Sequence, residues 1–112
     1  AMIETTVLDY LSDKLDVPVY MEEPEKPPKQ YVIIEKTGSG RKNYINSAML
    51  ALQSYGETLL QAAELNEQVK DAMEDIVELD SISQAELNTD YNFTDTQTKR
   101  YRYQAVYDLV FF

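Results

Sequence analysis

The sequence predicts an α+β fold, a four-stranded antiparallel sheet with two helices packed on one face, in the order α-β-β-α-β-β. Two segments repeat apolar residues at helical spacing, and four segments are extended and rich in β-branched and aromatic residues. Each predicted helix has one apolar stripe to bury, which places both helices on the same sheet face. With 112 residues, the chain is expected to form a single domain over residues 1–112.

The first predicted helix covers residues 3–15, and Pro18 ends it because proline disfavours helical geometry in the residue before it. Residues 17–21 then form a short extended edge segment. Residues 22–29 contain three prolines and mixed charges, which predicts a loop. The apolar positions of this helix are Ile3, Val7, Leu8, Leu11 and Leu15.

A hairpin is predicted next, with strands at residues 30–37 and 44–53. The first strand contains Tyr31, Val32, Ile33 and Ile34 in succession and is therefore apolar on both faces. Residues 37–43 include two glycines and are predicted to form the connecting turn.

The second predicted helix begins after Ser54 and Glu57, whose spacing fits a capping box. A strand with one solvated face follows at residues 82–91, and residues 92–98 form a polar turn. Along this strand, one predicted face carries Ser83, Ala85, Leu87, Thr89 and Tyr91, and the opposite face carries Gln84, Glu86, Asn88 and Asp90. The predicted inner stripe of the helix is Leu59, Ala62, Ala63, Asn66, Val69, Ala72, Met73 and Ile76. Its outer face is acidic, with Glu64, Glu67, Asp71, Glu74, Asp75 and Glu78.

The closing strand runs to the last residue and requires cover on both sides. One face is expected in the core and carries Tyr101, Tyr103, Ala105, Tyr107, Leu109 and Phe111. The other face begins polar and becomes apolar, with Arg100, Arg102, Gln104, Val106, Asp108, Val110 and Phe112. Such an excess of apolar strand surface predicts assembly with copies of the chain or with a partner.

Composition excludes several function classes. The chain has no cysteine and no histidine, so thiol and imidazole chemistry and nearly all zinc sites are ruled out, and we expect neither an enzyme nor a cofactor. A net charge of −10 opposes tight nucleic-acid binding. No apolar run approaches a membrane span of about 20 residues. We expect Ala1 to be left from cloning and the natural chain to begin at Met2 in a cytoplasm.

Local motifs resemble ligand sites only superficially. The segment from Thr37 to Lys42 lacks the spacing of a phosphate loop and leads into a strand, so a flexible hairpin tip is expected. Its cations, Arg41 and Lys42, protrude from an acidic protein and could dock into an acidic patch on a neighbouring subunit. The segment that starts at Asp90 lacks the glycine of a calcium loop.

A family resemblance spans nearly the whole chain. The sequence resembles small neck and tail proteins of phages and prophages of Gram-positive bacteria. The segments that carry the resemblance are VPVYM at 17–21, PP at 27–28, YVIIEKTG at 31–38 with Arg41 and Asn43, QSY at 53–55, AELNE at 63–67, YNFTDT at 91–96 and KRYRY at 99–103. These motifs are structural, and none of them is catalytic.

The nearest functional group is the tail terminator or tail-completion proteins of long-tailed phages. The resemblance implies that six copies form a ring that caps the tail tube, stops its polymerisation and meets the head connector. It also implies that the chain resides in the host cytoplasm during assembly and then in the neck of the virion. The excess of acidic over basic residues suits the lumen of such a ring, because DNA would pass through it without binding.

The leading hypothesis is therefore a virion structural protein, a tail terminator or head-tail joining subunit that acts by oligomerisation. One alternative is a small acidic intracellular adaptor or inhibitor that binds a basic partner. Another is a metal-dependent enzyme that uses the acids of the second helix. The candidate interface residues are Arg41, Lys42, Arg100, Arg102, Val106, Val110 and Phe112, and cover of the last three by the loop at 22–29 is the competing interpretation.

Overall fold

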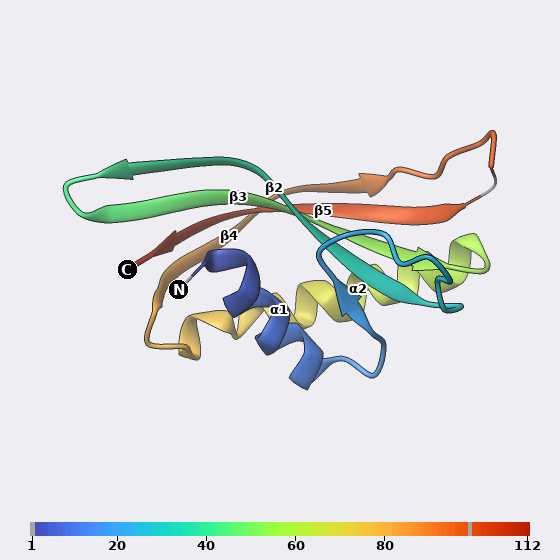
Figure 1. The fold of residues 1–112 in the computed structure, drawn as a ribbon, viewed down its shortest axis with the longest axis horizontal. Coiled ribbons are helices and arrows are strands. Elements are labelled where there is room, and N and C mark those ends of the chain that lie inside the picture. The colour runs from blue at the N-terminus through green and yellow to red at the C-terminus, as the bar shows by residue number, and fades with distance from the viewer. Residues whose placement is uncertain (1, 99) are drawn as a thin grey trace.

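The computed structural model describes residues 2–98 and 100–112. It shows an α+β fold in which two helices pack on a five-stranded mixed sheet with strand order β1-β2-β3-β5-β4 (Figure 1). The elements are α1 (Ile3–Lys14), β1 (Val19–Tyr20), β2 (Tyr31–Lys42), β3 (Ile45–Gly56), α2 (Leu59–Glu74), a 3-10 turn η1 (Ile76–Glu78), β4 (Ile82–Asn92) and β5 (Tyr101–Phe111).

The prediction of four antiparallel strands is wrong, because the sheet has a fifth strand that is parallel to its neighbour. The short edge segment after Pro18 joins the sheet as β1, which pairs parallel to β2 with Val19 opposite Val32. The amide of Val32 also donates to the carbonyl oxygen of Pro18 at 3.0 Å. Two residues of a parallel edge strand are too few to produce a periodic sequence signal, so the segment could be predicted as extended but not as paired.

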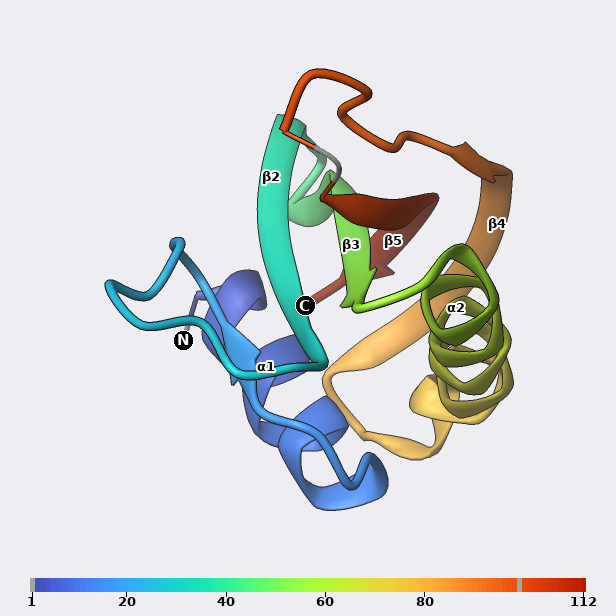
Figure 2. The ribbon, with the colours of Figure 1, turned by 90° about the vertical axis from the view of Figure 1, so that its right-hand side faces the viewer.

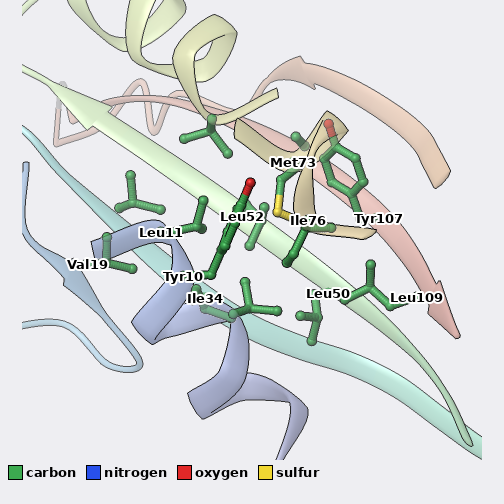
Figure 3. Close-up of a cluster of buried hydrophobic side chains, with 14 of the residues drawn as sticks. Tyr10, Leu11, Val19, Ile34, Leu50, Leu52, Met73, Ile76, Tyr107 and Leu109 are labelled. Atoms are coloured by element: carbon green, nitrogen blue, oxygen red, sulfur yellow. The ribbon is translucent and has the colours of Figure 1, made fainter. Parts of the chain in front are cut away.

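Both helices cover the same face of the sheet, as predicted (Figure 2). Between them and the sheet lies one apolar core, to which α1, α2 and every strand contribute (Figure 3). The Tyr10 hydroxyl donates to the carbonyl oxygen of Ala72 at 2.7 Å and so ties α1 to α2. The largest fully buried apolar side chains of this core are Leu11, Ile34, Leu50, Leu52, Leu65, Met73, Ile76 and Leu109.

The β2–β3 hairpin is longer than predicted because the glycine-containing segment is strand rather than turn. A bulge between Lys36 and Gly38 shifts the register, and pairing then continues to Lys42 opposite Ile45. The turn consists of Asn43 and Tyr44 alone. The hairpin projects past the helical layer along the long axis of a molecule that measures 44 × 25 × 24 Å (Figure 1).

The start of α2 differs from the predicted capping box. Ser54 is buried inside β3, and the N-cap is Thr58, whose hydroxyl oxygen accepts from the Gln61 amide at 3.1 Å. The Gln61 side chain accepts in turn from the Glu57 amide at 3.0 Å. The same capping chemistry therefore operates four residues later than predicted. Leu59 is exposed, while Leu65 was missed in the predicted stripe and is buried.

Register shifts in β4 reverse the predicted faces at its far end. The pairing with β5 shifts between Leu87 and Thr89. A shift of one residue exchanges the two faces of a strand, so Asp90 turns towards α2 and Tyr91 turns away from it. In β5 the predicted core face is confirmed for Ala105, Tyr107 and Leu109, with Phe111 packed beside them, whereas Tyr101 and Tyr103 are half-buried outside the main core.

Candidate assembly surface

The sheet face that points away from α1 and α2 carries no helix, and we call it the open face (Figure 2). Alternate residues of β2, β3, β5 and β4 form this face in rows that the strand register fixes. One row joins Ile33, Gln53, Gln104 and Tyr91, and the next joins Tyr31, Tyr55, Arg102 and Phe93. The open face is therefore polar and aromatic at the end of the sheet near the β4–β5 connection.

An aromatic and arginine cluster occupies that end of the open face. Tyr31 and Tyr55 stack with ring centroids 4.5 Å apart. The guanidinium of Arg102 lies 4.4 Å from the centre of the Phe93 ring and donates to the Tyr55 hydroxyl at 2.9 Å. Cations over aromatic faces stabilise such clusters, and stacked rings add to the apolar area that is buried.

The proline-containing loop closes over this cluster through one carboxylate. Glu23 forms an ion pair with Arg100 and accepts from the Tyr31 hydroxyl at 2.9 Å. Burial and the hydrogen bond to Glu23 raise the pKa of Tyr31, so its hydroxyl stays protonated as a donor. For Arg100, burial lowers the pKa while the hydrogen bond to Glu23 raises it, and the net shift is upward.

A chain of side-chain amides crosses the sheet beside the cluster. The Gln53 amide nitrogen donates to the Gln104 oxygen at 2.9 Å, and the Gln104 amide nitrogen donates to the Tyr91 hydroxyl at 2.6 Å. Both glutamines are buried, so these bonds satisfy groups that would otherwise lose their contact with water. The row therefore ties β3, β5 and β4 together on the open face.

Arg100 and Arg102 are thus placed together, as their sequence spacing suggests, but they are engaged within the chain. Arg100 contacts Glu23 and Tyr31, and Arg102 also donates to the Phe93 carbonyl oxygen at 2.7 Å. These internal partners give both arginines a structural role. A molecule that bound at this end would therefore contact arginine side chains that already have partners within the chain.

Val106 and Val110 lie further along the open face, and Phe112 follows at its end. Both valines are half-buried, whereas Phe112 is 74% exposed. A shallow hollow of about 440 Å³ lies here, lined in part by Gly38, Gly40 and Val110. The glycines leave the sheet surface bare at this point because they have no side chains to stand on it.

The proline-containing loop, which the competing interpretation places over these apolar residues, lies against the arginine end of the open face. Within residues 2–98 and 100–112, the hollows that the loop lines are flanked by Tyr31, Tyr55, Arg100 and Arg102. The loop therefore covers the arginine end of the open face, and Val106, Val110 and Phe112 lie outside those hollows.

Arg41 and Lys42 are the exposed last two residues of β2, at the same end of the sheet as Val110 and Phe112. Neither forms an ion pair with any residue that the structure describes. The predicted interface residues therefore separate into two groups. One group is the arginine cluster, and the other comprises the hairpin end and the bare part of the open face.

Tyr44 is predicted as the first residue of the strand at 44–53, and it is absent from the predicted interface residues. Tyr44 occupies the hairpin turn with a φ of 67°, and its side chain is 86% exposed. The preceding Asn43 was the available signal, because asparagine followed by one more residue between alternating strands favours a two-residue turn.

The acidic residues of α2 are exposed along its outer side. In the described part of the chain, no group of three or more acidic residues is arranged to hold a metal ion. No described helix has the length and apolar character needed to cross a membrane.

Comparison of the sequence with protein-family models and with curated proteins finds no match.

Proposed function

We propose that the chain is a virion structural protein of a long-tailed phage or prophage, a tail terminator or head-tail joining subunit that assembles into a ring on the tail tube. The sequence resemblance to neck and tail proteins suggests this role. The structural observation that supports it best is the bare end of the open face, where Phe112 is exposed and Val106 and Val110 are half-buried near a projecting hairpin (Figure 1).

A ring requires two different surfaces on each subunit that fit each other after a rotation. The chain offers such a pair in its basic hairpin end and the acidic outer side of α2. The net charge of −10 further suits a ring lumen that passes DNA without retaining it.

Electron microscopy of the purified chain, mixed with tail tubes assembled from the tail tube protein of the same phage or prophage, tests this proposal. The expected result is a ring of additional density at one end of each tube. A variant with Val106→Asp and Val110→Asp should lose this density while keeping its circular dichroism spectrum. Bare tube ends and an absence of rings at high protein concentration would overturn the proposal.

The acidic surface also supports a second candidate, a small adaptor or inhibitor that binds a basic partner. Glu64, Glu67, Asp71 and Glu74 are all exposed along α2. This candidate predicts a chain that stays monomeric in sedimentation and binds a basic protein with an affinity that falls with salt. Ring formation on tubes with no such binding would reject it.

A further inference from the structure

The tip of the β2–β3 hairpin presents an aromatic side chain in a backbone conformation that disfavours it. Asn43 and Tyr44 have φ values of 52° and 67°, as both central residues of a type I′ turn do. Glycine is the preferred residue at the second of these positions, and a bulky residue with positive φ is strained. A strained residue at a highly exposed position suggests a role outside the folded subunit.

The tip also concentrates positive charge in an acidic protein. Arg41 and Lys42 precede the turn and are exposed, and among the described residues neither has an ion-pair partner. Ile45, which follows the turn, is 50% exposed. The tip therefore combines an exposed aromatic residue, an apolar neighbour and two cations. This combination is typical of residues that anchor an interface.

A groove of complementary character lies between α2 and β4. It has a volume of about 310 Å³, which is at the lower end of the range for pockets that hold organic ligands. Met73, Ala85, Leu87 and Tyr107 line its apolar part, and Glu67, Asp71 and Glu74 line its acidic part. Lys70 is also present, but Glu67 and Asp90 each hold its ammonium group at 3.0 Å.

The tip and the groove of one molecule are separated by the fold. The tip lies at the end of the projecting hairpin, whereas α2 lies below the sheet (Figure 1), and the groove is lined by residues of α2, β4 and β5. A contact between them must therefore join two copies, and it would be heterologous, because different surfaces of each copy take part. The bulges in both β2 and β4 oppose the other simple solution, the direct pairing of free strand edges.

We propose that the hairpin tip of one copy inserts Tyr44 into the α2–β4 groove of the next copy, with Arg41 and Lys42 facing Asp71 and Glu74. This inference rests on the proposed function in that it assigns the contact between neighbouring subunits of the ring. Repetition of one heterologous contact closes a ring when its rotation divides a full circle.

Photo-crosslinking tests the contact directly. Benzoylphenylalanine is introduced in place of Tyr44, the sample is irradiated over a series of protein concentrations, and the crosslinked peptides are identified by mass spectrometry. The expected crosslinks join position 44 to the segments that contain Met73, Glu74 and Leu87 of a second copy. The matched control places the same photoreactive residue at Leu60, which is 67% exposed at the start of α2 and is not expected to reach the groove.

Charge reversal provides the second readout. Arg41→Glu with Lys42→Glu should lower the crosslinking yield by roughly tenfold, and mixing with Asp71→Lys plus Glu74→Lys should restore it. Lys26→Glu with Lys29→Glu, in the proline-containing loop, makes the same charge change elsewhere and should have no effect. Circular dichroism confirms that each variant is folded.

The outcomes separate this contact from the proposed function. If tubes are capped but position 44 crosslinks to another part of a second copy, the groove contact is overturned and the terminator role stands. If position 44 yields no crosslink between copies at any concentration and tubes remain bare, both are overturned. Crosslinks that survive charge reversal unchanged would also contradict the electrostatic pairing.

Discussion

Tyr31 and Tyr55 stack in parallel on neighbouring strands, with ring planes only 4° apart. This pair stands at the centre of the cluster that fixes the proline-containing loop and both arginines to the open face. Substitution of Tyr55 by Ala should lower the free energy of unfolding by about 3 kcal/mol, because a large buried ring is lost. Tyr55→Phe keeps the stack and loses hydrogen bonds, so it should cost about 1 kcal/mol.

Urea unfolding of the two variants measures the difference. Equal losses for Tyr55→Ala and Tyr55→Phe would mean that the hydroxyl group, rather than the stacked ring, holds the cluster together.

Asp90 connects β4 to α2 through two donors, and this connection gives a second prediction. Its carboxylate accepts from the Asn66 amide and from the Lys70 ammonium group, each at 3.0 Å. Asp90→Ala leaves the buried Asn66 side chain without this acceptor and should lower the free energy of unfolding by about 2 kcal/mol. Glu86→Ala, an exposed acid on the same strand, is the matched control and should change it by less than about 0.5 kcal/mol.

The free energy of unfolding should fall at alkaline pH, because the pKa values of Tyr107 and Lys70 are raised in the folded chain. Burial raises the pKa of Tyr107 from 10.0 to about 12, and hydrogen bonds to Glu67 and Asp90 raise the pKa of Lys70. A folded-state pKa above the unfolded value gives stability that is complete below the unfolded pKa and is lost as pH rises through the folded pKa. The titration of Tyr107 alone should therefore lower the free energy of unfolding by about 1 kcal/mol between pH 9 and pH 11.

Unfolding measured at these two pH values tests this assignment. Tyr107→Phe removes the titrating hydroxyl and keeps the buried ring, so the variant should lose correspondingly less stability over the same interval. An identical alkaline loss in the variant and the parent chain would show that other groups control it.

Tyr44 is expected to separate folding from assembly. Tyr44→Gly relieves the strain of a bulky residue at positive φ and should raise the free energy of unfolding by about 1 kcal/mol. The same substitution removes the aromatic anchor and should weaken self-association. Thermal unfolding and analytical sedimentation give the two quantities. Loss of both stability and assembly would indicate that Tyr44 supports the hairpin itself.

Much of the fold follows from local patterns in the sequence. Period-two alternation correctly placed Ala105, Tyr107 and Leu109 in the core, and helical spacing placed Val7, Leu11 and Val69 there. The pairing of the fifth strand could not be predicted, because it depends on tertiary structure. Val19 and Tyr20 reach β2 only through the path that the chain takes at Pro18. Tyr91 was assigned to the wrong face because a bulge reverses a strand without changing its composition.

The candidate surface was only partly predictable for a similar reason. Arg100 and Arg102 were predicted as partner contacts, but their roles depend on Glu23, which is distant in sequence and reaches them only after β1 and β2 pair. The exposure of Arg41 follows from the polar hairpin end, which is a local pattern, although the sequence predicts this residue in a turn and the structure places it in β2. Its proposed partners lie on another molecule and leave no pattern in this sequence.

The most direct test of the central proposal is a tube-elongation assay, in which the chain is added to polymerising tail tube protein and tube lengths are measured by electron microscopy over time. We expect elongation to stop once about one ring of subunits is present per tube end, and we expect the Tyr44→Gly variant to stop it poorly. Tubes that continue to lengthen in the presence of an excess of folded, monomeric chain would overturn the proposed terminator role.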